Sequence, residues 1–198
     1  MGKESEIEIL DIDKAEVTRR LAELRARHEG VHRFRRIEFL LGGDSNGAHS
    51  WGRVRTNGKE TTITVKEMSG RGGFSSMKEF EVTADDFSEA VRIMSRLIDP
   101  KAMLYFENER DAYWLGDAYV TIDKWPEIPA YLEIEAPSMA SVKKARALLG
   151  VKGKFVGNAN IHKIYESYGL DFRKVMAKNG PKLAKLAGSK LTTSKRSQ

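Results

Sequence analysis

The sequence lacks cysteine altogether, so its 198 residues can form neither disulfide bonds nor thiolate metal sites. It contains no apolar run near the roughly 20 residues that a membrane-spanning helix needs, and its N-terminus lacks the apolar stretch of a secretory signal. It also lacks the GxxxxGK[ST] phosphate-binding loop and the GxSxG nucleophile motif. We therefore expect a cytoplasmic protein that does not cross a membrane and belongs to neither of these enzyme classes.

Histidine is scarce too, and a conventional zinc site is not expected. The four histidines are His28, His32, His49 and His162, and without any cysteine they do not complete a conventional zinc-ligand motif. Asp and Glu are the remaining candidate metal ligands, and their oxygen atoms suit the hard cations Mg²⁺ and Mn²⁺.

Basic charge is concentrated at the C-terminus. Residues 174–198 contain seven Lys and Arg and no acid, so of the net charge of +6 the remaining residues 1–173 carry 6 − 7 = −1. We predict a globular domain over residues 1–173, followed by a basic, mobile tail over residues 174–198. If the protein binds nucleic acid, the tail is the segment that we expect to do so.

The apolar residues alternate with polar ones over many short segments, which is typical of strands that are buried on one side. Asn57-Gly58 and Gly116-Asp117 are hairpin turn sequences, the first typical of a type I′ turn. We expect helices after Asp13, over 84–98, from Ser138 to Gly150 and over 160–168. The predicted fold is α+β, with about eight strands in an antiparallel sheet. The strands are expected at residues 4–12, 31–41, 51–56, 59–67, 78–82, 105–115, 118–125 and 130–136.

Charges of one sign are paired at positions i and i+2, where side chains share one face of a strand. The opposite faces are apolar, as with Ile134 between two glutamates. The pairs or triplets are Glu4, Glu6 and Glu8; Arg33 and Arg35; Arg53 and Arg55; Glu79 and Glu81; Glu133 and Glu135.

Two interpretations of this pattern are about equally supported by alternation alone. In the first, the charged faces meet water and the apolar faces meet the helices. In the second, the sheet closes into a barrel whose wet, charged bore holds a ligand. Segregation of acids and bases onto different strands favours the second, because like charges repel unless a bound cation and a bound anion compensate them.

Several longer motifs between residues 4 and 170 resemble those of one known family. ESEIEILDID opens the chain, WGRVR, ITVKE, KEFEV and ENERDAYW follow, and VTIDKWPEIPAYLEIEAP and IHKIYESYGLD come last. This set is similar to that of the CYTH superfamily, the triphosphate tunnel metalloenzymes, and most similar to its class IV adenylyl cyclase-like branch. The resemblance implies a closed antiparallel β-barrel, the triphosphate tunnel, with flanking helices.

The sequence departs from the family pattern at two lysines. The hallmark of the first strand is Glu-x-Glu-x-Lys, and either Glu8 or Leu10 stands in place of its lysine, depending on which glutamates are aligned. A second expected lysine, near Arg110, is replaced by Asn108. The first departure bears on activity, because a lysine there would contact phosphate or help to organise the attacking group.

The resemblance implies a metal-dependent enzyme that acts on a triphosphate. Mg²⁺ or Mn²⁺ would be bound by acids that are also catalytic, namely Glu4, Glu6, Asp123, Glu133 and Glu135. Substrate would be bound by Arg35, Arg53, Arg55, Lys66, Glu79, Glu81 and Arg110.

Three functions remain open at this stage. An adenylyl cyclase, a lyase that converts ATP to cyclic AMP and pyrophosphate, is the first. A hydrolase of inorganic tripolyphosphate, thiamine triphosphate or a nucleoside triphosphate is the second. A non-catalytic binder of polyphosphate or nucleic acid is the third, motivated by the missing lysine and the basic tail.

Overall fold

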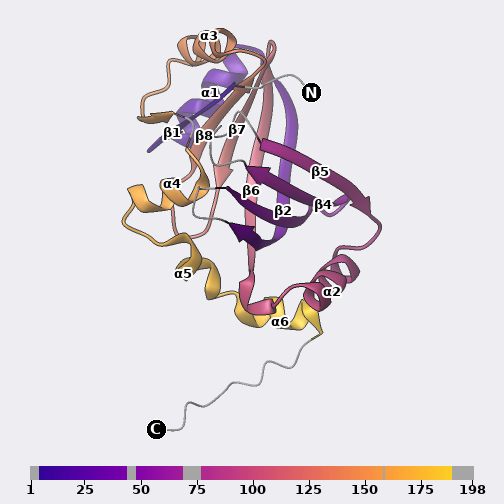
Figure 1. The fold of residues 1–198 in the computed structure, drawn as a ribbon. Coiled ribbons are helices and arrows are strands. Elements are labelled where there is room, and N and C mark those ends of the chain that lie inside the picture. The colour runs from indigo at the N-terminus through magenta and orange to yellow at the C-terminus, as the bar shows by residue number, and fades with distance from the viewer. Residues whose placement is uncertain (1–4, 44–47, 69–76, 158, 189–198) are drawn as a thin grey trace. The chain divides into compact units, whose positions relative to one another are not determined.

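The computed structural model describes residues 5–43, 48–68, 77–157 and 159–188, and its fold is α+β (Figure 1). Nine strands form one sheet in the order β5-β4-β3-β2-β6-β7-β8-β1-β9. They are β1 (Ser5–Leu10), β2 (Arg27–Gly43), β3 (His49–Thr56), β4 (Thr61–Met68), β5 (Met77–Ala84), β6 (Met103–Leu115), β7 (Ala118–Lys124), β8 (Tyr131–Ala136) and β9 (Lys154–Gly157).

The sheet is antiparallel, as predicted, but its strand order is linear. The registers of β1 with β8 and β9, β2 with β3, β3 with β4, β4 with β5, β6 with β7 and β7 with β8 all run antiparallel. The order begins with β5 and ends with β9, and no pairing among the described residues joins these two strands. The antiparallel α+β fold is therefore confirmed, whereas closure into a barrel stays a prediction.

The helices are short and lie between or after the strands in the chain. They are α1 (Lys14–Glu23), α2 (Phe87–Leu97), the 3₁₀ helix η2 (Pro100–Ala102), α3 (Met139–Leu149), α4 (Ile161–Ser167), α5 (Phe172–Ala177) and α6 (Gly180–Ala187). Among the helices of the described residues, none has both the length and the apolar character that crossing a membrane requires.

The chain divides into two compact units. Unit 1 comprises residues 1–34 and 107–175, and unit 2 comprises residues 35–106 and 176–198. Strands β2 and β6 each contribute residues to both units.

The core of unit 1 lies between the apolar sheet face and two helices. Ile7, Val120 and Ile134 are buried in one cluster that also holds side chains of α1 and α3. Asp13 caps α1 by accepting hydrogen bonds from two backbone amides, and Ser138 caps α3 in the same way with one. The helix positions and caps expected from the sequence are confirmed here, because local capping and an apolar stripe both specify them.

The core of unit 2 packs α2 against β3 and its neighbours. Ile37, Phe39 and Val54 are buried together with Phe87 and other α2 residues. A Cβ atom at residue 52 would lie 2.2 Å from the ring of Phe39, so only glycine fits there. The helix begins after its cap, Asp86, because β5 extends to Ala84.

The apolar face of β5 is more exposed than the sequence predicts. Phe80 and Val82 are 57% and 62% exposed, although the barrel hypothesis places them beneath helices. The reason is that β5 lies at one end of the strand order, and α2 packs against β3 and not against β5.

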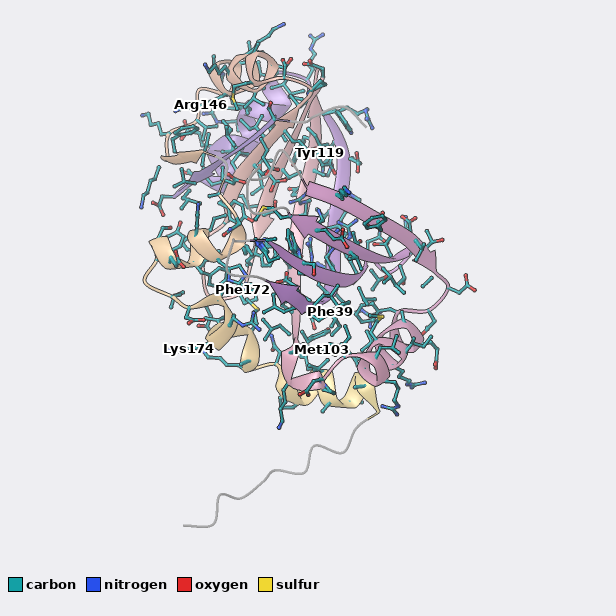
Figure 2. The ribbon with its side chains drawn as sticks, viewed as in Figure 1. Phe39, Met103, Tyr119, Arg146, Phe172 and Lys174 are labelled. Atoms are coloured by element: carbon teal, nitrogen blue, oxygen red, sulfur yellow. The ribbon has the colours of Figure 1, made fainter. Side chains whose placement is uncertain are left out.

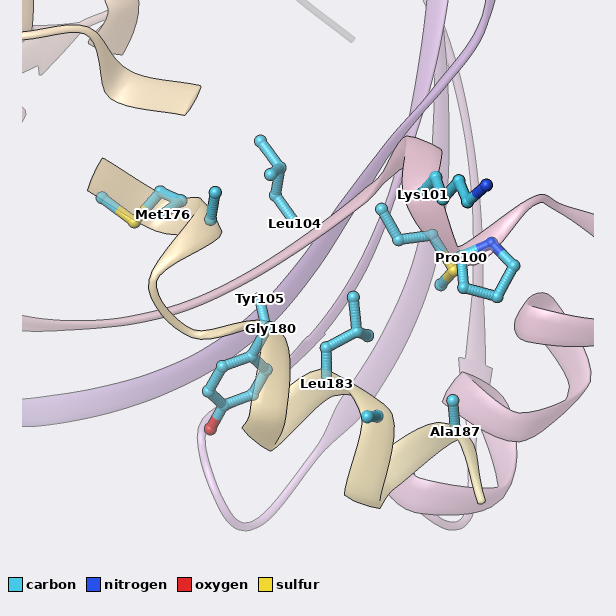
Figure 3. A pocket seen from close by; sticks show the side chains of 11 residues that line it. Pro100, Lys101, Leu104, Tyr105, Met176, Gly180, Leu183 and Ala187 are labelled. Atoms are coloured by element: carbon cyan, nitrogen blue, oxygen red, sulfur yellow. The ribbon is translucent and has the colours of Figure 1, made fainter. Parts of the chain in front are cut away.

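The segment after residue 173 is partly folded, in contrast to the mobile tail that its composition suggests. The expected boundary falls inside α5, and Leu183 and Ala187 of α6 are buried. Leu183 belongs to the core of unit 2. Beside α6 lies an apolar cavity of about 200 Å³, which Figure 3 shows between η2, the start of β6 and the helix. Of the expected tail, residues 189–198 lie outside the described part of the chain.

Candidate functional site

In unit 1, the sheet face opposite α1 and α3 carries aligned rows of polar and aromatic residues. The strand registers define three rows that cross β6, β7, β8 and β1 in order. They are Trp114, Tyr119, Glu135 and Glu6; then Ala112, Thr121, Glu133 and Glu8; then Arg110, Asp123 and Tyr131. The sequence predicts most of these acids, and their alignment comes from the register.

Four carboxylates are juxtaposed on β1 and β8. Glu6 is the direct partner of Glu135, and Glu8 is the direct partner of Glu133. Directly opposite residues have Cβ atoms about 5 Å apart, and like charges there destabilise a sheet. This arrangement favours the binding of a cation at this position.

Glu8 is the most deeply buried of these acids, with 3% of its surface exposed. Burial, followed by the negative charges of Glu133 and Glu6, raises the pKa of Glu8 to about 8, even though the backbone amide of Ala159 donates to it over 2.7 Å. The side chain therefore holds a proton near neutral pH unless a cation approaches. Glu8 is one of the two residues that can replace the family's first-strand lysine, and the register places it among the acids.

Arg110 is held by two of the predicted acids. Its Nε and Nη2 atoms donate to the two oxygens of Asp123 over 3.0 and 2.8 Å, and Nη2 lies 3.0 Å from Glu133. Burial opposes the charge of Arg110, but Glu133 and Asp123 raise its pKa above the usual value. The guanidinium therefore stays charged and fixed in orientation.

Asp123 is fully buried and engaged by protein groups. Besides Arg110, it accepts hydrogen bonds from Thr121 Oγ1 over 2.9 Å and from Asn108 Nδ2 over 3.4 Å. As it stands, Asp123 orients Arg110, a different role from the metal ligand that the resemblance implies. Asn108 Oδ1 is buried without a hydrogen-bond partner among the described residues, at the position where a lysine was expected.

The chemistry of the carboxylates fits Mg²⁺ or Mn²⁺, since both cations prefer oxygen ligands. Within the described part of the chain, however, no three His, Asp or Glu side chains converge as a metal site. Glu4, one of the predicted ligands, lies outside that part. Metal binding at the juxtaposed glutamates stays a prediction.

In unit 2, the corresponding cations lie on β3 and β4. Arg53 is the register partner of Glu38 and Thr64, and Arg55 is the partner of Arg36 and Thr62. Lys66 lies 3.1 Å from Glu79, and Thr64 Oγ1 donates to Glu81 over 2.6 Å. The predicted residues Arg53, Arg55, Lys66, Glu79 and Glu81 thus share one face.

Arg53 is a cation without full compensation. Burial and the neighbouring Arg55 lower its pKa to about 10, although Glu79, Glu81 and Glu38 oppose the shift. Its buried Nε has no hydrogen-bond partner among the described residues. An anion such as phosphate would supply both the charge and the missing acceptor.

Arg35 does not share the face of these cations. Its guanidinium lies 4.8 Å from the ring centroid of Phe87, on the α2 side, and its register partner is Thr56. Arg36 occupies the cationic face instead, opposite Arg55. The alternation of buried Ile37 and Phe39 was the available signal, because it assigns odd positions to the core.

Two loop sequences are candidates to form a pocket for the organic group of a substrate. They are the GGDSNGAHS and SGRGGFSS segments, of which residues 44–47 and 69–76 lie outside the described residues.

Comparison with known proteins gives matches among solved structures alone. No family model matches the chain, and no curated protein sequence matches it. A protein from Pyrococcus horikoshii shares 19% identity at a TM-score of 0.59, with 76% of this chain and 92% of that one covered.

Two similar structures carry functional descriptions. A candidate adenylyl cyclase from Hippeastrum, described as having a dominant triphosphatase activity, shares 15% identity at a TM-score of 0.53, over 85% of this chain and 96% of that one. A candidate adenylate cyclase from Bacillus halodurans shares 15% identity at 0.54, over 83% and 99%. At these identities the likeness is one of fold.

Proposed function

We propose that the protein is a metal-dependent enzyme that acts on a triphosphate. The observation that carries the proposal is the two opposed pairs of glutamates on β1 and β8, beside an arginine that Asp123 and Glu133 hold in place. Clustered carboxylates suit a divalent cation, and a fixed guanidinium suits a phosphate oxygen. Within unit 2, Arg53, Arg55 and Lys66 are separate candidate phosphate-binding groups.

The residues of unit 1 have separate roles in this proposal. Glu6, Glu133 and Glu135, with Glu4 before them in sequence, would hold Mg²⁺ or Mn²⁺, and Glu8 would lose its proton when the cation binds. The bound metal would supply charge neutralisation and a lower pKa for an attacking hydroxyl or water. Arg110 neutralises a phosphate oxygen, and Asp123 keeps it in the orientation to do so.

Cyclisation of ATP is the reaction that the sequence motifs favour. The ribose 3′ oxygen would attack the α-phosphorus, the bond from that phosphorus to the bridging oxygen would break, and pyrophosphate would leave. Catalysis then consists mainly of positioning and charge stabilisation.

Hydrolysis of a triphosphate is the alternative, favoured by the dominant triphosphatase activity described for the Hippeastrum protein of the same fold. It needs the same metal and cations, with water as the attacking group in place of a ribose hydroxyl. A non-catalytic binder remains the third reading, because the two expected lysines are absent.

The deciding experiment incubates purified protein with ATP, thiamine triphosphate or tripolyphosphate, each with Mg²⁺ or Mn²⁺, and identifies the products. Cyclic AMP with pyrophosphate supports cyclisation, and orthophosphate released from tripolyphosphate with ATP intact supports hydrolysis. Melting temperatures measured alongside should rise with metal and tripolyphosphate together. Binding at a hundredfold excess over Kd adds about 2.7 kcal/mol to the free energy of unfolding. If the protein showed no turnover and no melting shift at millimolar metal, the proposal would be refuted. A melting shift without turnover would indicate a binding protein.

A further inference from the structure

An aromatic pair borders the carboxylates of unit 1. Trp114 on β6 and Tyr119 on β7 are register partners, with ring centroids 4.9 Å apart and planes tilted by 49°. Both rings are partly exposed, and the guanidinium of Arg27 lies 5.9 Å from the Trp114 centroid. Figure 2 labels Tyr119 within the sheet of this unit. The pair thus presents aromatic surface on a face that is otherwise charged.

Glu29 holds both rings by their polar edges. Its Oε2 accepts from Trp114 Nε1 over 2.7 Å, and its Oε1 accepts from the Tyr119 hydroxyl over 3.2 Å. Burial and the charge of Glu29 raise the pKa of Tyr119 to about 12, so its hydroxyl remains a donor. His32 Nε2 also lies 3.4 Å from Oε1, and each carboxylate oxygen has two lone pairs, so Glu29 can accept a further hydrogen bond from a ligand.

The aromatic pair and the glutamates belong to one row of the sheet face. Tyr119 is the direct register partner of Glu135, which in turn faces Glu6. Direct partners have Cβ atoms about 5 Å apart, so a ring stacked on Tyr119 would lie beside a phosphate chain held near Glu135. Apolar packing does not require this position, because the core of unit 1 lies on the other face.

We propose that Trp114, Tyr119 and Glu29 form a subsite for a nucleobase, so that the triphosphate substrate is a nucleotide. The two rings provide a stacking surface, and Glu29 accepts from an exocyclic amino group, as adenine, guanine and cytosine carry. The inference rests on the proposed function and deepens it, because it names the organic group of the substrate.

Unit 1 also offers a matched control for this pair. Phe155 on β9 is 49% exposed and has the guanidinium of Arg146 over its ring at 4.6 Å. Its register partner is Ile9, a core residue, so it lies on the opposite face of the sheet. An exposed aromatic ring under an arginine is therefore present at a place where no nucleobase is expected.

The test is calorimetric titration of ATP and of tripolyphosphate, with Mg²⁺, into the wild type and three variants. Trp114→Ala should weaken ATP binding by about tenfold or more and leave tripolyphosphate binding unchanged, since stacking acts on the base alone. Trp114→Phe retains a ring and should lie between the two. Phe155→Ala should bind both ligands as the wild type does.

The outcomes separate this inference from the proposed function. Tripolyphosphate binding with no loss of ATP affinity in Trp114→Ala overturns the nucleobase subsite and leaves the proposed function standing. An equal loss for both ligands also overturns it, because the tryptophan would then act on the phosphate site or the fold. Wild-type protein that binds neither ligand refutes the proposed function and the subsite with it.

Discussion

Glu8 shows how one side chain couples the candidate site to stability. It is a buried acid whose neighbours on the same face, Glu6 and Glu133, are also acids. Removing a carboxylate from water costs free energy unless a cation or proton compensates it. Without metal, Glu8 takes a proton, and with metal it can ionise. The effect of its burial on the free energy of unfolding is therefore measured in the metal-free protein.

We predict that Glu8→Gln stabilises the metal-free protein at alkaline pH. The folded pKa of about 8 lies above the ordinary value of 4.5, so the folded protein keeps this proton while the unfolded chain loses it. Stability therefore falls as pH rises from about 4.5 to about 8, and the loss is complete above that range. Glutamine has no such loss, so the variant should exceed the wild type by roughly 1–4 kcal/mol near pH 9 and match it near pH 4.

Urea denaturation in the presence of a chelator, at both pH values, measures this difference. Glu60→Gln, at an exposed position before β4, serves as the control and should change stability by less than about 0.5 kcal/mol at either pH. If Glu8→Gln were less stable than the wild type near pH 9, the carboxylate would be ionised and paired in the folded state.

At the scale of elements, the side chains of β8 alternate between the carboxylate face of the sheet and the core of unit 1. Glu133 faces the carboxylate side, where it contacts Arg110, and Ile134 is fully buried under the helices of unit 1. We predict that Glu133→Gln folds normally but loses metal-dependent tripolyphosphate binding by about tenfold or more. Ile134→Asp should fail to fold, because an unpaired buried charge costs several kcal/mol out of a total stability of about 5–15 kcal/mol.

Circular dichroism and calorimetric titration of the two variants check this prediction. Leu132→Met, a volume-conserving change in the same core cluster, is the control and should cost less than about 1.5 kcal/mol. A folded Ile134→Asp variant would mean that the faces of β8 are assigned in the wrong sense.

Local signals predict the elements well and their turns less well. The hairpin at Asn57-Gly58 is present, but of these two residues only Gly58 has a positive φ. The Asn57 side chain accepts hydrogen bonds from the backbone amides of Lys59 and Glu60. The result is a longer turn than type I′, because an Asx interaction competes with the left-handed conformation at asparagine. The Gly116-Asp117 turn is a two-residue connection, as expected.

The elements that the sequence did not predict depend on distant partners. Strand β9 has four residues and exists by pairing with β1, which precedes it by more than 140 residues. The assembly of the candidate site has the same origin: sequence alternation identifies Glu6, Glu133 and Glu135, but the register brings them together. The contact between Asp123 and Arg110 likewise depends on the strand register, which no local sequence pattern specifies.

At the scale of the whole molecule, the C-terminal segment combines two characters. Its composition is basic, but Pro181 in the first turn of α6 and apolar residues at 183 and 187 give it a helix start and a buried stripe. The basic composition is typical of a mobile tail, but the i, i+4 spacing of residues 183 and 187 is typical of a packed helix. Net charge governs association with other molecules and does not decide whether a segment packs.

We predict that removal of residues 189–198 leaves stability unchanged, whereas removal of residues 174–198 destabilises the protein. The longer deletion takes away α6, and with it the buried side chain of Leu183, whose loss alone typically costs about 2–5 kcal/mol. Thermal melts of both truncations measure the difference, and Leu183→Ala and the exposed Lys185→Ala separate packing from charge. If the longer truncation melted like the full chain, α6 would contribute nothing to the core of unit 2. If Lys185→Ala cost as much as Leu183→Ala, the charge of α6, and not its apolar stripe, would hold it in place.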